Sequence, residues 1–285
     1  MTLQTKARIE VHPLSPALGA EIRGVDLAQP MDDAAFAEIL QAWHDHGLIL
    51  LRGQTFDEDQ QVAFGRRFGP VAPWSRFAVK EKGRHPYIML VTNLKENGEF
   101  VGSLPEGEIE FHSDGIYIEQ PSAGTMLHAV AIPSKGGQTA FSNMYKVYET
   151  LPDALKAKLA GLKARHAFTY NSQKKDENDR KKADADIASF EHPVVRTHPA
   201  TGRKALYVNR LMTEEIVGLP ADESRRVLDA LFAQIERPEF IYEHEWRVGD
   251  VLLWDNRCLT HARRDFPAEE LRLMRRLTIA GERPV

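Results

Sequence analysis

The sequence predicts a mainly β protein with a few helices, of the β-sandwich or jelly-roll class. Many short apolar or alternating segments are bounded by Gly, Pro, Asn and Asp, which is typical of strands joined by turns. Only a few segments have the period of an amphipathic helix. Parallel βαβ repeats and Gly-rich phosphate loops are both absent from the sequence, so the β classes fit best.

The composition is that of an ordinary globular protein and indicates one domain. The 285 residues are 42% hydrophobic and 27% charged, and no repeat or clear linker divides residues 1–285. A net charge of −4 gives no footprint for nucleic acid or an anionic membrane. No apolar run is long enough to span a membrane, and the N-terminus lacks the apolar stretch of a secretory signal. We therefore expect a cytoplasmic protein with neither nucleic-acid nor membrane partners.

The first 70 residues alternate helix and strand. Asp32-Asp33 can cap a helix whose apolar residues recur at helical spacing until Gly47 ends it. The apolar run at 48–51 predicts a short buried strand. A second short helix follows from about Asp57, with Gly69-Pro70 as its stop.

The rest of the chain is predominantly β. Strands are expected around a Pro-Ser-Lys-Gly-Gly turn, and two short helices follow, joined at Leu151-Pro152. Residues 227–235 mark an amphipathic helix, and residues 240–246 alternate as a half-buried strand does. The expected strands after residue 80 are 87–92, 123–132, 138–142, 205–209, 240–246, 251–254 and 273–280.

Two segments are candidates for a lid over a binding site. Residues 75–110 are rich in Gly, Pro and charge around one expected strand. Residues 171–189 are highly charged and nearly free of large apolar groups. Loops of this kind often close over a bound substrate.

His112 and Asp114 stand two positions apart in the run EFHSDGIYIEQP. If they lie on a strand, their side chains point to the same face and can reach one ion. Two protein ligands are too few, and a third His would complete the two-His, one-carboxylate face that suits non-haem Fe(II). The single cysteine, Cys258, excludes a Cys-rich zinc site, and no neighbouring residue suggests an activated thiolate.

His261 is the best candidate for the third ligand. The strand VLLWDN delivers it just past the strand's end, whereas His128 lies among apolar residues and is better explained as core. On the final strand Arg272 and Arg276 share parity and are expected to face one side, where two guanidinium groups need anionic partners. Arg275 is expected on a solvated basic edge.

Together these motifs resemble the taurine/chlorophenoxyacetate (TauD/TfdA) branch of the Fe(II)/2-oxoglutarate-dependent dioxygenases. The resemblance covers nearly the whole chain, including GLILLRGQ, FGRRFGP, PSKGGQTAFSNM and GDVLLWDNRCLTHARR. It implies a double-stranded β-helix core, also of jelly-roll or cupin-like type, with helices packed outside. It further implies a homo-oligomer, a dimer or a tetramer.

The resemblance also implies the site. His112, Asp114 and His261 match the iron triad, while Arg272 and Thr139 match the residues that hold the distal carboxylate of 2-oxoglutarate. Arg276 matches a position that binds the acid group of the substrate. The implied cofactor is Fe(II), the cosubstrates are 2-oxoglutarate and O₂, and the implied products are succinate, CO₂ and a hydroxylated substrate.

The substrate is expected to be a small organic anion. Asp114, in place of Ala or Gly, argues for oxygenation rather than halogenation. Hydroxylation beside a heteroatom would let an ether, amine or sulfonate cleave. Of the residues that flank the triad, we expect that Phe111 and Ile116 line the substrate pocket, and that Tyr117 either lines it or packs in the core. Trp254, Asp255 and Asn256 are expected to fix the turn that aims His261.

Two other functions remain open on the sequence. A metal-dependent hydrolase would use the same triad with zinc but would leave Arg272 and Thr139 without a role. A non-catalytic jelly-roll protein that binds a small acid would need the arginines but not the triad.

Overall fold

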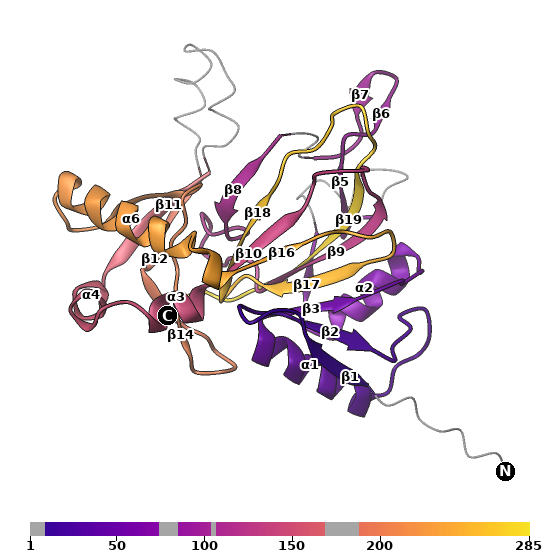
Figure 1. The fold of residues 1–285 in the computed structure, drawn as a ribbon, viewed down its shortest axis with the longest axis horizontal. Helices are drawn as coiled ribbons and strands as arrows, with labels where there is room; N and C mark the ends of the chain where they lie inside the picture. The colour runs from indigo at the N-terminus through magenta and orange to yellow at the C-terminus, as the bar shows by residue number, and fades with distance from the viewer. Residues whose placement is uncertain (1–8, 74–84, 104–106, 169–187) are drawn as a thin grey trace.

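The structure is a computed structural model that describes residues 9–73, 85–103, 107–168 and 188–285. Two sheets, the larger one mostly and the smaller one fully antiparallel, form its centre (Figure 1). The larger sheet has the order β1 (Glu10–Pro13), β2 (Ala20–Arg23), β3 (Leu48–Leu51), β17 (Val251–Asp255), β9 (Gly124–Ala131), β19 (Leu273–Ile279) and β4 (Val71–Ala72), with β5 (Ile88–Thr92) also paired to β19. One pair in it, β2 with β3, is parallel.

The smaller sheet has four strands in the order β16 (Ile241–His244), β10 (Thr139–Asn143), β18 (Leu259–Arg263) and β8 (Ile109–His112). Its neighbouring strands come from distant parts of the sequence, as a jelly-roll topology requires. The prediction of a mainly β, jelly-roll type fold with flanking helices is confirmed.

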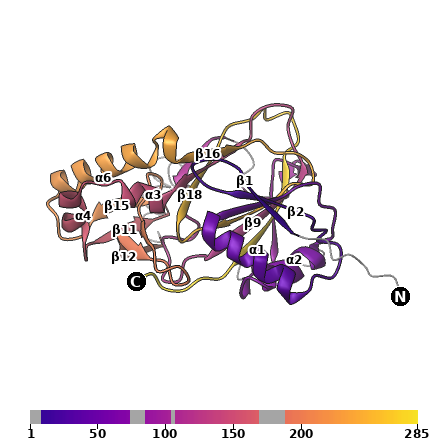
Figure 2. The same ribbon diagram turned by 60° about the horizontal axis from the view of Figure 1, so that its bottom comes forward.

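Strand residues alternate between two cores. In β3, Leu48 and Leu50 face the core between the sheets, whereas Ile49 and Leu51 face the outside of the larger sheet. There they pack under α1 (Asp33–His46) and α2 (Glu58–Arg66), which cover that outer face in Figure 2. Because both faces are covered, β3 can be apolar at every position.

The predicted limits of α1 are confirmed. Asp32 caps its start by accepting a hydrogen bond from the Ala35 amide at 2.8 Å. Gly47 ends it with φ of 71°, a left-handed conformation that glycine adopts without steric cost, and its amide reaches the Trp43 carbonyl at 2.8 Å.

A smaller layer packs beside the two sheets, at the left of Figure 1. It joins a three-stranded sheet to α6 (Ala221–Ile235), whose buried face includes Leu228, Leu231 and Phe232. The strands β11 to β15 were mostly missed, since only 205–209 was expected there. The elements of this part are α3 (Met144–Glu149), α4 (Asp153–Leu159), β11 (Lys163–Ala167), β12 (Ser189–Pro193), β13 (Val195–Thr197), β14 (Lys204–Leu206), β15 (Thr213–Ile216), α6 (Ala221–Ile235) and the 3₁₀ turn η3 (Pro238–Phe240).

The two lid candidates lie partly outside the described residues. This applies to 75–84 and 104–106 of the first candidate and to 171–187 of the second. Described parts of the first form β5, the hairpin of β6 (Lys95–Glu96) with β7 (Glu99–Phe100), and the start of β8. A lid function for either segment stays a prediction.

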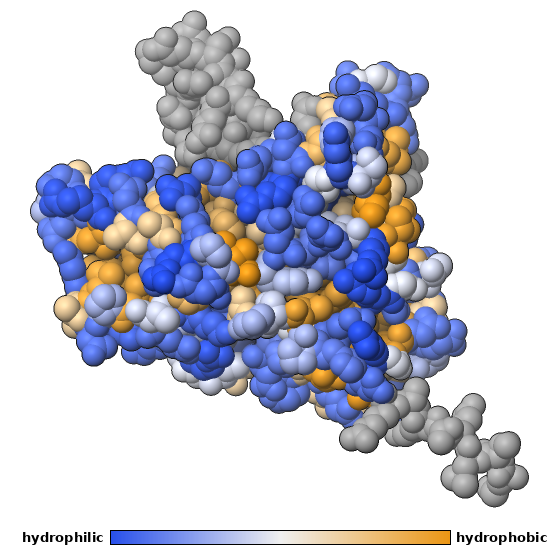
Figure 3. All heavy atoms as spheres, viewed as in Figure 1, coloured by the Kyte–Doolittle hydropathy of each residue, from blue (hydrophilic) through white to orange (hydrophobic). Residues whose placement is uncertain are grey.

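The surface in Figure 3 is largely hydrophilic, with apolar residues showing between the charged ones. Within the part of the chain that the structure describes, no helix is both long and apolar enough to cross a membrane.

A buried pair of histidines makes stability depend on pH. The rings of His166 on β11 and His192 on β12 lie 5.8 Å apart. Burial, with His192 as a second cause, lowers the pKa of His166 to about 3. The unfolded imidazole titrates near 6.5, so below that pH the unfolded state binds protons that the folded state does not. Folding stability must therefore fall as the pH drops from 6.5.

We expect His166→Leu to make the free energy of unfolding less dependent on pH, by about 1.4 kcal/mol per pH unit between pH 6 and pH 4.5. Leucine fills a similar volume but cannot titrate. Urea denaturation of both proteins across this range measures the two slopes. Equal slopes would show that His166 titrates in the folded protein much as it does in the unfolded chain.

Candidate active site

Three ligand-type side chains meet between the two sheets. His112 is the last residue of β8 and stands directly opposite His261 of β18, with their ring centroids 4.1 Å apart. Asp114 follows two residues after His112, and one potential ligand atom from each of the three lies within 4.8 Å of the others. Among the residues that the structure describes, this is the group with the composition and spacing of a metal site.

The sequence-based account of how these residues converge was wrong in two details. Asp114 is not on the strand with His112, because β8 ends at His112 and a turn follows, with Gly115 at φ of 72°. His261 is not in a loop past a strand, because it lies in the middle of β18. The turn, and not the strand period, brings the carboxylate back toward the two imidazoles.

Two donors hold the Asp114 carboxylate. Arg276 of β19 donates to Oδ1 at 2.8 Å, and Thr125 of β9 donates to Oδ2 at 2.6 Å. The same two oxygens lie 3.9 Å and 4.0 Å from Nε2 of His112 and His261, respectively. Burial opposes the charge, but the Arg276 guanidinium, helped by the hydrogen bond from Thr125, outweighs it and holds the pKa of Asp114 well below its usual range. Asp114 is therefore a carboxylate at neutral pH.

The two imidazoles are neutral at the same pH. Burial lowers the pKa of His112 despite the opposing charge of Asp114, and burial together with His112 lowers that of His261 further. Nδ1 of His112 lies 2.9 Å from the Glu110 carbonyl, which can only accept, so Nδ1 carries the proton. Nε2 then presents a lone pair toward Asp114. Two neutral imidazoles and one carboxylate fit a divalent transition metal.

An inner chamber lies next to the triad and contains Arg272. Its wall includes His112, His261, Thr139, Arg263, Arg272 and Arg276. Arg272 is 2% exposed, and its Nε has no hydrogen-bond partner among the described residues. Burial and nearby Arg263 lower its pKa to about 9, so the guanidinium is still charged at neutral pH. A buried charge of this kind needs an anion.

Thr139 is arranged to help hold such an anion. Its hydroxyl oxygen accepts a hydrogen bond from the Trp246 indole at 3.0 Å, which leaves its proton free to donate. The donors of Arg272 and Thr139 on one chamber wall fit a buried carboxylate, such as the distal one of 2-oxoglutarate.

Arg272 and Arg276 both line the inner chamber, as expected, but not because they share strand parity. Arg272 precedes β19, and the pairing of β19 with β9 shifts register between Leu273 and Met274, so strand parity does not relate Arg272 to Arg276. Arg275, expected on a solvated edge, is partly buried: it donates to the Phe56 carbonyl at 3.2 Å, just before α2, and its Nε lies 3.5 Å from Glu58 of α2.

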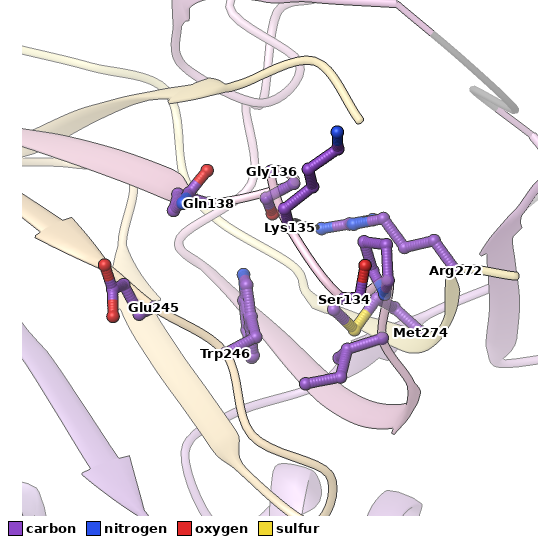
Figure 4. Close-up of a pocket in the computed structure, with 11 residues that line it drawn as sticks. Ser134, Lys135, Gly136, Gln138, Glu245, Trp246, Arg272 and Met274 are labelled. Atoms are coloured by element: carbon purple, nitrogen blue, oxygen red, sulfur yellow. Dashed lines mark hydrogen bonds between the residues drawn. The ribbon is translucent and has the colours of Figure 1, made fainter. Parts of the chain in front are cut away.

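A rear pocket of about 350 Å³ opens on the other side of Arg272. In Figure 4 the Arg272 side chain extends toward the turn that carries Lys135 and Gly136, and Trp246 lies across the pocket from Arg272. A Cβ atom on the next residue, Gly137, would lie 3.2 Å from Arg272 Nε. The PSKGGQT turn therefore closes tightly over the arginine at Gly137, whereas a Cβ on Gly136 would clash with the Asp265 carbonyl oxygen.

A front pocket of about 420 Å³ opens over the triad, and Arg276 lies between it and the inner chamber. Tyr117 lines this pocket, and its ring lies 4.9 Å from that of Phe168. Tyr117 lies in the turn that follows β8, so the alternation of side chains along a strand does not determine where it points. The apolar part of the lining is Met89, Ile109, Tyr117, Phe168, Leu211 and Met212.

Phe111 and Ile116 were wrongly expected in this pocket. Phe111 immediately precedes His112 on β8 and therefore faces the other side of the smaller sheet, where it packs on Ala140 and Ala262. Ile116 is fully buried against Tyr207 and Met212, in the layer that supports the turn after β8.

Several site residues were not foreseen from the sequence. Thr125 contacts Asp114, Arg263 lies near Arg272, and Phe168 lines the front pocket. Thr125 sits in an apolar strand pattern and Phe168 near a charged segment, so neither has a local signal. Arg263 stands within HARR and could have been singled out by its spacing from His261. Asn256, expected with Trp254 and Asp255 to fix the turn that aims His261, also contacts Thr125.

Comparison with known proteins agrees with this geometry. The model of the family described as "Taurine catabolism dioxygenase TauD, TfdA family" matches residues 10–278. The (S)-phenoxypropionate/alpha-ketoglutarate-dioxygenase of Sphingobium herbicidovorans is 34% identical over 96% of this chain and 95% of its own.

Solved structures agree as well. A taurine dioxygenase from Burkholderia xenovorans superposes with a TM-score of 0.81 at 30% identity, covering 97% of this chain and 92% of that one. AAD-2, solved with Mn(II) and N-oxalylglycine, gives 0.80 at 26% identity, covering 97% and 99%. Members of this family use alpha-ketoglutarate (2-oxoglutarate), O₂ and a metal. The chain belongs to the TauD/TfdA family and is a 2-oxoglutarate-dependent dioxygenase.

Proposed function

We propose that this protein uses Fe(II) to hydroxylate a small organic anion whose tail is apolar, with 2-oxoglutarate and O₂ as cosubstrates. The front pocket carries the proposal, because it combines one cation, Arg276, with a lining that is otherwise mainly aromatic and aliphatic. An aryl or alkyl carboxylate or sulfonate matches both features. The relative from Sphingobium herbicidovorans, which by its name acts on phenoxypropionate, supports this substrate class.

In this proposal His112, Asp114 and His261 hold the iron. Arg272 and Thr139 bind the distal carboxylate of 2-oxoglutarate in the inner chamber. The bound metal supplies the oxidising chemistry, in which 2-oxoglutarate is converted to succinate and CO₂ and one oxygen atom enters the substrate. The protein contributes orientation and a buried, shaped pocket.

Arg276 holds the acid group of the substrate while it keeps its contact with Asp114. One of its terminal nitrogens donates to Asp114, while its buried Nε has no partner in the described part of the chain. A substrate acid bound here would place the carbon next to it close to the triad. If that carbon also bears an ether, amine or sulfonate group, hydroxylation gives an unstable product that fragments, so the net result is bond cleavage.

Succinate release tests the function. The purified protein is incubated with Fe(II), 2-oxoglutarate and a panel of aryloxy acids, alkyl sulfonates, sulfate esters and N-substituted amino acids. We expect substrate-coupled succinate with anionic members that have apolar tails. A zinc hydrolase or a non-catalytic acid-binding protein would form none with any member.

Arg276→Leu tests the anionic part of the proposal. Removing one partner of a buried charge pair costs about 2–5 kcal/mol, so the affinity for acids should fall at least about 30-fold. Each acid is compared with its primary alcohol, which controls for any change at Asp114 because both compounds meet the same metal site. Unchanged affinity for the acids would remove the anionic-substrate argument.

Assembly and location stay predictions. A dimer or tetramer is checked by sedimentation of the purified protein, and a cytoplasmic location by fractionation of cells.

A further inference from the structure

A chain of buried hydrogen bonds runs from the larger sheet to the Asp114 carboxylate. The Trp254 indole Nε1 lies 3.0 Å from Oδ1 of Asn256, and Nδ2 of Asn256 lies 2.9 Å from the Thr125 hydroxyl. That hydroxyl lies 2.6 Å from Oδ2 of Asp114. Trp254, Asn256 and Thr125 are each no more than 1% exposed, so no solvent competes for these bonds.

The direction of every bond in this chain is determined. An indole N–H can only donate, so the Asn256 oxygen must face Trp254 and its amide nitrogen must face Thr125. Because that amide donates to the Thr125 oxygen, the Thr125 hydroxyl is left with its own proton to donate. A carboxylate only accepts, so this proton points at Asp114. This chain of hydrogen bonds through Trp254, Asn256 and Thr125, which we call the relay, therefore donates in one direction, from Trp254 to the carboxylate.

The relay and Arg276 together fix both oxygens of Asp114. Thr125 holds Oδ2 from β9, and Arg276 holds Oδ1 from the neighbouring strand β19. The Asp114 amide lies 3.4 Å from the Asn256 oxygen, so the same asparagine also contacts the backbone of the turn after β8. The carboxylate is not on a strand, and these contacts replace the constraint that a strand would give.

We propose that Thr125 and Asn256 are positioning residues that orient the Asp114 carboxylate for metal binding, with Trp254 setting their polarity. The inference rests on the metal site of the proposed function. Hydrogen-bond partners around metal ligands orient them and tune their strength, and losing one typically costs about 10–100-fold in metal affinity or activity.

Titration with Mn(II) or Co(II), without cosubstrates, tests the relay apart from turnover. Thr125→Val keeps the shape of the side chain but removes the hydroxyl, and should weaken metal binding about 10-fold. Thr125→Ser restores the donor and should bind metal nearly as well as the wild type. The Co(II) absorption spectrum should change in the valine variant and return in the serine variant, because it reports the arrangement of the ligands.

The matched control is Thr260→Val. Thr260 is also a buried threonine on a strand, but its hydroxyl contacts the Met144 sulfur at 3.6 Å and not the triad. It should bind metal as the wild type does. Asn256→Ala should weaken metal binding, and the double variant with Thr125→Val should lose less than the sum of the two single losses, since both act in part through the Thr125 hydroxyl. If Asn256→Ala does not fold, the valine and serine variants at Thr125 still decide the question.

The outcomes separate the two proposals. If the wild type binds no divalent metal, the proposed function fails. If the wild type binds metal and Thr125→Val binds it equally well, or no more weakly than Thr260→Val does, the relay is overturned. Additive losses in the double variant would also overturn it, because independent structural damage behaves that way.

Discussion

Asp114→Asn should abolish substrate-coupled succinate formation, with a loss of more than about 100-fold, the upper end of what removing a partner around a metal ligand costs. The substitution keeps the shape of the side chain but removes its charge. A neutral amide binds a divalent metal more weakly than a carboxylate does, and its NH₂ group would face either the Arg276 or the Thr125 donor. Metal titration and succinate release measure the two consequences separately.

The control for this prediction is Asp250→Asn. Asp250 is also a buried aspartate, and it accepts from Arg52 at 2.8 Å and lies 3.0 Å from His244, with no contact to the triad. This variant should lose stability to urea yet bind metal as the wild type does. Succinate formation by Asp114→Asn at the wild-type rate would show that Asp114 is not a metal ligand.

The fold class could be predicted from the sequence because it depends on short strands and their turn residues. The buried strand β3 and both ends of α1 follow from local chemistry, an apolar run, an Asp cap and a Gly stop. The sequence of β11 to β15 has no comparable strand signal, because charged and polar residues such as Arg165 and Glu214 alternate less regularly with the apolar ones. Their place depends on packing against α6.

The candidate site shows where strand parity succeeds and where it fails. The period of two would have placed Phe111 away from His112, as the structure does, because both lie on β8. The same rule could not place Asp114 or Tyr117, because β8 ends at His112. The Asp114-Gly115 pair, a common turn signal, could have marked that end. Residue types could indicate a two-His, one-carboxylate set, but not the path that joins its members.

Contacts between the sheets were beyond any sequence argument. The ion pair of Arg276 with Asp114, and the bond from Thr125, depend on how β19 and β9 face the turn after β8. Neither local pattern nor spacing contains that relation. The family resemblance brought Arg276 into the site as a substrate contact, and the structure adds its second partner.

Arg272→Met should weaken the binding of 2-oxoglutarate at least about 30-fold, because truncating one partner of a buried charge pair costs about 2–5 kcal/mol. Methionine retains part of the apolar stem but has no charge and no donor. The distal carboxylate would then enter the inner chamber with Thr139 as its remaining partner on that wall. Equilibrium binding of 2-oxoglutarate to the metal-loaded protein measures the change.

The same variant should be at least as stable as the wild type without 2-oxoglutarate, which a loss of binding through misfolding would not produce. Among the described residues, the buried Arg272 guanidinium makes one long hydrogen bond, 3.4 Å to the Gly137 carbonyl, and its Nε has no partner. Removing its charge therefore relieves a desolvation cost. Added 2-oxoglutarate should raise the melting temperature of the wild type but not of the variant. Arg275→Met is the control, since Arg275 faces α2 and should change neither binding nor the ligand-induced shift. An unchanged affinity in Arg272→Met would place the distal carboxylate elsewhere, whereas a fall in both stability and affinity would make the arginine a structural residue first.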